Sequence, residues 1–477
     1  MNYSSAVPRK DSKSSPRVPV TDSVIQSPTA AEKTKAGVLV WLFFWALISP
    51  VFIDLGPFGL PLYRLILIFT VVPCMIMWIL GRLGPIRIAD LLVLAFTIWA
   101  AVCMVFNHGL VAQYEFIGFT FVDTAGGYFL GRALIRNAAT FLGMVKVHLI
   151  TLVFLMPFAM LETQTGAPLL IELLQPYIRT QPVIDHEVRL GLERAQTVFQ
   201  HPILFGIYAA GILGSVFFGL GFRASKLSTV LRTTVVTVCT ICSVSSGAFL
   251  ALIIQVAFII YERVMSPRAW RWKVILLLVA IFYILTDLVT NRSVVQIVIA
   301  NLTLNPSTGF NRIRIWEYGT QNVAANPIFG LGLRDWVRPA WMVASLDNFW
   351  LLVAMRYGYP GIFLYLGAFL LLLWQLGTAK SLSALTTDIR RGVLISLGGV
   401  MIAAITVSLW GPIYSWLMFT LGGIVWILEE NSTRQKNLNI PVTGAAPVAA
   451  SEVEQGNSQI VYSRFSHKNA QDHGGGR

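Results

Sequence analysis

The sequence predicts an all-α integral membrane protein with about 12 transmembrane helices, both termini in the cytoplasm and a large periplasmic loop between helices 9 and 10. Three observations predict this fold class. Of the 477 residues, 55% are hydrophobic and 12% are charged, which argues against a soluble fold. Apolar stretches of about 20 residues, long enough to cross a bilayer as one helix, recur along the chain. Basic residues gather in alternate connections between these stretches, as the positive-inside rule expects.

Each predicted span is a stretch dominated by aliphatic and aromatic residues, and the fourth and seventh carry the weakest apolar signal. In chain order the predicted spans are Ala36–Ile53, Leu65–Leu80, Leu91–Phe106, Glu115–Leu130, Phe141–Leu161, Pro202–Leu220, Thr229–Cys242, Ser246–Tyr261, Val274–Leu288, Phe349–Leu376, Val393–Leu409 and Ile413–Leu428.

The basic N-terminal tail sets the orientation. Residues 1–35 carry six Lys and Arg, and every second connection is basic as well, which predicts that both termini lie inside. The net charge of +13 is mostly this topology signal, with some attraction to anionic lipid, and no nucleic-acid partner is expected. Residues 1–35 and 429–477 are too polar to bury a core, so we expect two disordered tails around a membrane domain at 36–428.

The four cysteines all fall within predicted spans. Cys239 and Cys242 have the spacing of a redox or metal-binding pair, but no His or acidic residue stands beside them. We interpret all four as small packing residues, and we expect no metal and no cofactor.

Two predicted outer loops, 162–201 and 289–348, are long, and long loops in compact proteins are usually functional or disordered. The second is rich in aromatic and aliphatic residues, which is not a disordered composition. Within it we expect an amphipathic helix over Arg312–Ala324, ended by Asn326-Pro327 because the residue before proline disfavours helix. Gly330-Leu331-Gly332 predicts a turn that allows close backbone approach.

The predicted outer face carries arginine and no lysine. Arginine offers a planar fork that binds phosphate through two hydrogen bonds and is less strongly hydrated than lysine, so this surface suits a diphosphate headgroup. Alternatively, each arginine snorkels or pairs with an acid such as Glu193, Glu317 or Asp335. The outer arginines are Arg64, Arg179, Arg189, Arg194, Arg292, Arg312, Arg314, Arg334 and Arg338.

Five short segments in or next to these loops resemble the bacterial O-antigen ligase and polymerase superfamily, which includes exopolysaccharide polymerases. The resemblance lies in their order and their placement relative to the spans, and it covers 36–428. The segments are Arg194–Pro202 (RAQTVFQHP), Arg312–Trp316 (RIRIW), Asn326–Gly332 (NPIFGLG), Asp347–Leu352 (DNFWLL) and Tyr357–Gly361 (YGYPG).

The resemblance implies a metal-independent, inverting glycosyltransferase at the periplasmic face of the bacterial inner membrane. The implied donor is a glycan on undecaprenyl diphosphate. The implied acceptor is a second lipid-linked glycan in a polymerase, or lipid A core in a ligase. Membrane lipid and the proteins of polysaccharide assembly and chain-length control are the implied partners.

Loop chemistry and the resemblance together give a set of candidate residues. Arg194 and Arg312 are expected to bind the diphosphate and stabilise charge on the leaving group. Family ligases carry a histidine near the start of the span after the large loop, whereas residues 290–360 here contain none. Asp347 stands in that region, as a general base or as the N-cap of the next helix, and the missing histidine favours a polymerase. The remaining substrate-binding candidates are Arg189, Glu193, His201, Arg314, Trp316 and Arg338.

Three further positions remain open at this stage. Asp123 and Arg356 lie within predicted spans, where charge is costly, so they either pair with each other or line a polar cavity. Ser246 stands where the family often has arginine, and close helix packing is its expected role.

Two alternatives come from other classes of protein. A transporter of lipid-linked or anionic substrate would also have twelve spans, but there is no clear internal repeat. A scaffold of a polysaccharide export complex has only the tails in its favour.

Overall fold

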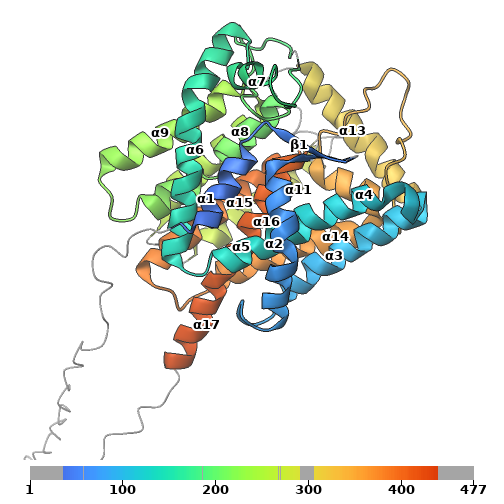
Figure 1. The fold of residues 1–477 in the computed structure, drawn as a ribbon. Coiled ribbons are helices and arrows are strands. Elements are labelled where there is room, and N and C mark those ends of the chain that lie inside the picture. Colours follow the sequence, from blue (N-terminus) through green and yellow to red (C-terminus); the bar gives the residue numbers. More distant parts are fainter. Residues whose placement is uncertain are drawn as a thin grey trace, which may run out of the picture. The chain divides into compact units, whose positions relative to one another are not determined.

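The computed structural model describes residues 36–56, 58–184, 186–266, 268, 270–289 and 306–438. The predicted tail at 1–35, residues 439–477 of the C-terminal tail and Arg292 lie outside the described residues. The described chain is mostly helical and adds one two-stranded antiparallel sheet (Figure 1).

Helices follow one another with short connections through most of the chain. Their bounds are α1 Val38–Leu47, α2 Leu62–Ile79, α3 Ile88–His108, α4 Leu110–Phe121, α5 Gly127–Leu134, α6 Ala138–Thr165, α7 Leu169–Leu174, α8 Pro202–Ala210, α9 Lys226–Cys242, α10 Ser246–Met265, α11 Arg271–Val289, α13 Pro306–Ala325, α14 Phe349–Thr378, α15 Ala384–Ala403, α16 Gly411–Gly422 and α17 Trp426–Leu438. Two π-helices, η1 Val122–Gly126 and η2 Ser215–Leu220, and two strands, β1 Phe52–Leu55 and β2 Phe58–Pro61, complete the elements.

Seven helical segments of the described chain are long and apolar enough to cross a membrane, and they overlap seven of the predicted spans. They mark the chain as a helical membrane protein. Their bounds are Leu62–Ile79, Ile88–His108, Ala138–Thr165, Pro202–Leu220, Ser246–Met265, Phe349–Thr378 and Gly411–Asn437.

The other five predicted spans contain helix too, but the first and fourth differ from a single span. The span predicted at Ala36–Ile53 contains only the 10-residue helix α1, which stops before Pro50 and gives way to β1. Proline disfavours helix in the residue before it, so the chain turns out of the helix there. The span predicted at Glu115–Leu130 is divided into α4, η1 and α5.

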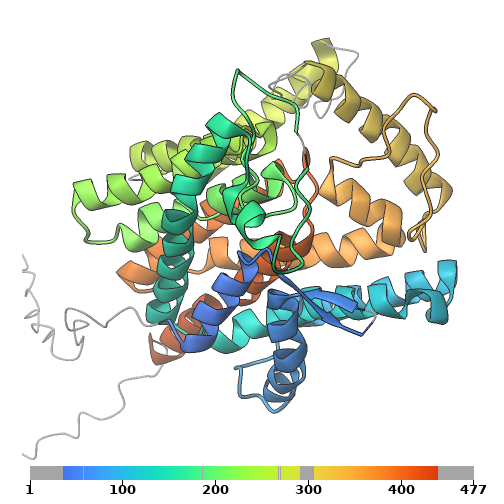
Figure 2. The ribbon, with the colours of Figure 1, turned by 45° about the horizontal axis from the view of Figure 1, so that its top comes forward.

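The predicted helix in the large loop is confirmed as α13, which begins earlier than expected, at Pro306, and ends at Ala325, directly before Asn326-Pro327. Together with the loop after it, α13 builds a small hydrophobic cluster against the first half of α14. Ile315, Trp336 and Met355 are buried in this cluster. Both ribbon views place α13 beside α14 (Figures 1 and 2). The loop is thus a folded unit seated on a long apolar helix.

A break in α14 receives this loop. At Gly358 the backbone leaves helical geometry, with φ of 67° and ψ of −173°. Leu331 donates its N–H to the Met355 carbonyl at 2.7 Å, and Gly332 donates to the Arg356 carbonyl at 3.1 Å. A Cβ atom on Gly358 would lie 2.1 Å from a loop carbonyl oxygen, so glycine is required there. The expected close backbone approach at 330–332 is confirmed, and it fixes the loop to the helix.

The π-helix η1 places Asp123 beside Arg64 of α2. The Asp123 carboxylate accepts hydrogen bonds from the Arg64 guanidinium at 2.7 and 3.1 Å. The pairing of Asp123 with Arg356 that the sequence left open is therefore wrong, because Asp123 has a partner on another helix. The alternative, that both line a polar cavity, is confirmed in part: both line one cavity, but most of its lining is aromatic and aliphatic.

Candidate functional site

Three arginines from the two long loops, 162–201 and 289–348, act electrostatically on one carboxylate. We call Arg189, Arg194 and Arg312 the arginine cluster. Asp347 interacts electrostatically with all three, and Arg189 acts on both of the others. Arg194 and Arg312 are only 8% and 4% exposed. The fold therefore brings both predicted diphosphate ligands to the same place as the predicted base.

The segment that carries Arg194 is ordered by a buried acid on α6. The Glu162 carboxylate accepts the backbone N–H groups of Gln196 at 2.8 Å and Thr197 at 2.9 Å. The sequence placed Glu162 only as the first residue of a long loop and predicted no role for its side chain. A signal was present, because an acid in the last turn of a helix opposes the helix dipole and requires a compensating partner.

A tight turn positions Arg189. Leu190 and Gly191 both have positive φ, 55° and 75°. Arg189 and Leu192 exchange both backbone hydrogen bonds across the turn, at 3.0 Å each. The turn holds the Arg189 side chain, half-buried, next to Arg194.

The Arg312 guanidinium is buried with few partners. Its Nη2 donates to the Ser246 hydroxyl at the start of α10, at 3.3 Å. Among the described residues, Nε and Nη1 of Arg312 and Nε of Arg194 have no hydrogen-bond partner. A buried unsatisfied donor costs about 1–3 kcal/mol, and more when it is charged. Donors of this kind are complementary to an anion.

The electrostatics of the cluster favour an anion as well. Burial, followed by the charge of Arg189, lowers the pKa of Arg194 to about 10, and burial lowers the pKa of Arg312. Arg194 is therefore still a cation near neutral pH. Among the described residues, Asp347 and the exposed Glu187 oppose this lowering of the Arg194 pKa.

Asp347 does not cap α14. The N-cap is Asn348, whose side-chain oxygen accepts the Leu351 N–H at 3.0 Å, so the cap interpretation of Asp347 is wrong. Burial raises the pKa of Asp347, and the three cluster arginines act in the opposite direction. A half-buried carboxylate with a raised pKa, free of a capping role, is suited to accept a proton.

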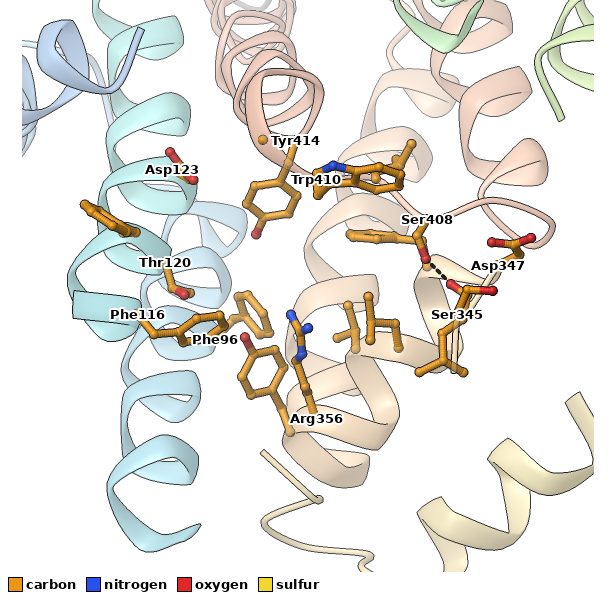
Figure 3. Close-up of a pocket in the computed structure, with 18 of the residues that line it drawn as sticks. Phe96, Phe116, Thr120, Asp123, Ser345, Asp347, Arg356, Ser408, Trp410 and Tyr414 are labelled. Carbon is orange, nitrogen blue, oxygen red and sulfur yellow. Dashed lines mark hydrogen bonds between the residues drawn. The ribbon is translucent and has the colours of Figure 1, made fainter. Parts of the chain in front are cut away.

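Asp347 also lies at one end of a cavity of about 510 Å³ between α2, α4, α14 and α16. We call it the aromatic cavity. Figure 3 shows Asp123 and Asp347 on opposite sides, with the Arg356 side chain directed inward between them. The lining residues are Arg64, Phe96, Phe116, Phe119, Thr120, Asp123, Ala344, Ser345, Leu346, Asp347, Phe349, Leu352, Val353, Arg356, Tyr357, Ser408, Leu409, Trp410, Gly411 and Tyr414.

Other candidate residues lie apart from the cluster. Arg314 pairs with Glu317 at 3.1 Å, and Arg338 pairs with Asp335 at 2.6 Å. Trp316 packs against the hydrophobic cluster of the loop. These two arginines fit the alternative interpretation of outer arginines, in which an acid neutralises each one.

His201 and Glu193 adjoin Arg194 but have different surroundings. The His201 ring nitrogen Nδ1 accepts the Ile203 N–H at 3.1 Å and caps α8. Burial, followed by His186 and the nearby arginines, lowers the pKa of His201 to about 3, so its ring is neutral near pH 7. Glu193 lines a small cavity of about 180 Å³ together with Arg194 and Glu162.

The small residues at the start of α10 pack closely, as expected. A Cβ atom on Gly247 would lie 2.1 Å from the Val407 side chain. Ser246 has a second contact that the sequence did not predict, the hydrogen bond from Arg312. Within the described residues, no group of three or more His, Cys, Asp or Glu is placed to hold a metal ion.

No family model matches the chain, and no curated protein matches it. The class of protein therefore rests on the fold, which is that of a helical membrane protein.

Proposed function

We propose that this chain is a membrane glycosyltransferase of surface polysaccharide assembly. It would have twelve spans with both termini in the cytoplasm and would act at the periplasmic face of a bacterial inner membrane. It would transfer a glycan from undecaprenyl diphosphate to a second lipid-linked glycan, with inversion and without a metal. The observation that carries the proposal is the convergence of two buried, incompletely bonded arginines, Arg194 and Arg312, on Asp347 at the edge of the aromatic cavity.

The arginine cluster would bind the diphosphate of the donor. Guanidinium groups form paired, charge-assisted hydrogen bonds with phosphate oxygens. Charge grows on the diphosphate as it leaves, and preorganised donors aimed at that charge lower the barrier. The free N–H groups of Arg194 and Arg312 are donors of this type.

Asp347 would act as the general base. An acceptor hydroxyl oxygen forms a bond to the anomeric carbon from the side opposite the diphosphate. The bond from that carbon to the phosphate oxygen breaks, and its electron pair leaves on the diphosphate. The hydroxyl proton passes to Asp347, whose raised pKa makes it a stronger base than an ordinary carboxylate.

Two arginines on one helix provide the matched test. Arg312 has unsatisfied donors, whereas Arg314, two residues along α13, is neutralised by Glu317. With purified lipid-linked glycan, Arg312→Ala should slow chain growth about 10²- to 10³-fold, the usual cost of losing one such donor. Arg314→Ala should stay near wild type. Full polymer output by Arg312→Ala at a normal protein level would refute the assignment.

Deletion of the gene separates the related functions. Single repeat units left on the carrier lipid would identify a polymerase. Full-length chains stranded on the carrier lipid would identify a ligase to lipid A core. Unchanged polysaccharide would favour a transporter of lipid-linked or anionic substrate.

A further inference from the structure

Arg356 is a cation of the aromatic cavity that the proposed transfer does not use. Arg356 lies in α14, two residues before the break at Gly358. Its side chain is directed into the cavity toward the side where Tyr414 lies (Figure 3). It comes from α14, whereas Arg312 of the cluster comes from α13.

The position of Arg356 is fixed by the loop. Its carbonyl accepts the Gly332 N–H at 3.1 Å, where the break in α14 leaves it without a helical partner. Its guanidinium carbon lies 5.5 Å from the centre of the Phe116 ring. Arg356 also acts electrostatically on the hydroxyl group of the neighbouring Tyr357. A side chain held in this way loses little conformational entropy when it binds a ligand.

The charge of Arg356 is not balanced inside the cavity. The other lining arginine, Arg64, is neutralised by Asp123 at 2.7 Å. Asp347 lies at the far end, where the cluster arginines act on it. Among the described residues, no carboxylate is within ion-pair distance of Arg356. The cavity therefore presents one unpaired cation.

The remaining lining suits a sugar ring. Aromatic faces can cover the C–H faces of a pyranose, while hydroxyl groups bond to its rim. The cavity supplies both, with Phe119, Trp410 and Tyr414 as rings and Thr120 and Ser345 as hydroxyl groups. Its volume of about 510 Å³ is that of a small-molecule site.

We propose that the aromatic cavity binds a sugar residue that carries a carboxylate, and that Arg356 pairs with that carboxylate. One planar guanidinium matches one carboxylate through two parallel hydrogen bonds, whereas the three-arginine cluster matches the larger charge of a diphosphate. The inference rests on the proposed function and names its substrate class, a glycan that contains a hexuronic acid or a similar acidic sugar.

Direct binding tests the inference without transfer. The full-length protein in detergent is titrated with a glucuronic-acid-containing disaccharide, its methyl ester and its neutral glucose counterpart, with tryptophan fluorescence as the readout because Trp410 lines the cavity. The acid should bind about 10- to 100-fold more tightly than the ester and the neutral sugar, the range of a hydrogen bond to a charged group. Equal binding of the three, or no binding of any, would overturn the inference.

Variants locate the effect. Arg356→Gln should remove the preference for the acid and leave neutral-sugar binding unchanged, and Arg356→Lys should keep part of the preference. Arg338→Gln, an arginine already paired with Asp335, is the control and should bind like wild type. A preserved acid preference in Arg356→Gln would overturn the assignment. If Arg356→Gln fails to fold, the comparison of acid with ester in the wild-type protein still decides.

The two proposals can fail separately. Arg312→Ala should lose transfer and keep the preference for the acidic disaccharide, because Arg312 does not line the aromatic cavity. A protein that polymerises through Arg312 but binds acid and ester alike would refute the acidic-sugar inference only. A protein that prefers the acid but transfers nothing would refute the glycosyltransferase proposal only.

Discussion

Two buried arginines in this protein, Arg132 of α5 and Arg312 of α13, have very different surroundings. They are 2% and 4% exposed. Arg132 lies 3.4 Å from carboxylate oxygens of both Asp90 and Glu429, and it donates to the Pro85 carbonyl at 2.7 Å. Among the described residues, Arg312 has no carboxylate within ion-pair distance, and its Nη2 donates to the Ser246 hydroxyl at 3.3 Å.

The difference teaches that pairing, and not burial, separates a structural charge from a binding group. Asp90 also accepts from the Trp78 indole at 3.0 Å and from the Tyr128 hydroxyl at 2.7 Å. Within the described chain, Nε of Arg132 has no hydrogen-bond partner either, but two carboxylates balance the charge of Arg132. A buried charge without a partner is expensive, and natural proteins keep one mainly where function requires it. Arg312 is a buried charge of this kind, without a carboxylate partner among the described residues.

The largest expected effect concerns Asp347, on which all three arginines of the cluster act. Asp347→Asn keeps the shape but cannot accept a proton, so transfer should fall by about 10²- to 10⁴-fold. In the wild type, Asp347 is deprotonated above its raised pKa and protonated below it, so transfer should decline as pH falls through a value above the ordinary 3.8. Transfer rates measured as a function of pH should show this decline at low pH in the wild type and no such decline in Asp347→Asn. An unchanged profile in the variant would exclude Asp347 as the base.

Arg132 should be mainly a stability residue. Arg132→Met leaves the buried Asp90 without its cation, whereas Glu429 keeps Arg136 at 3.9 Å. The loss should destabilise the protein by about 3–5 kcal/mol. Thermal melting of the purified protein measures the loss. Arg132→Met combined with Asp90→Asn should recover part of it, because one uncompensated charge is removed.

Arg312→Met sharpens the contrast and should change stability much less. It removes a buried cation that has no carboxylate partner. The free energy of unfolding should therefore fall by no more than about 1 kcal/mol, as for an ordinary substitution, and the melting temperature should stay near the wild-type value or rise. If Arg312→Met and Arg132→Met melted at the same lowered temperature, the distinction between the two arginines would be wrong.

The smallest effect is expected at His201. Asn is a good N-cap, so His201→Asn should keep α8 capped and cost less than about 1 kcal/mol. Because the pKa of His201 is about 3, its replacement should not alter the dependence of transfer on pH between 5 and 8. Loss of a limb near pH 6 in this variant would instead place His201 in the chemistry.

Local sequence patterns predicted much of the fold. Apolar stretches located the long helices, and Asn326-Pro327 located the end of α13, since both depend on neighbouring residues. The break of Glu115–Leu130 at η1 was not predicted. The backbone there departs from the α-helix where Asp123 meets Arg64, a residue 59 positions away in the chain.

The candidate site was predicted in part for the same reason. Arginine in place of lysine pointed to Arg194 and Arg312, because side-chain chemistry is readable locally. Which arginines stay unpaired depends on the tertiary fold. Arg314 is an arginine like Arg312, but it pairs with Glu317, three residues away. The role of Glu162 was missed because its partners lie more than 30 residues along the chain.

The loop that packs into the break of α14 links the two proposed binding groups. A backbone hydrogen bond connects Gly332, seven residues after the end of α13, to the carbonyl of Arg356. The helix that carries Arg312 is therefore connected through a short loop to the residue that faces the cavity. Under the two proposals, Arg312 binds the diphosphate and Arg356 binds an acidic sugar. The acidic sugar would then lie at a fixed distance from the lipid anchor, and the chain would grow by whole repeat units.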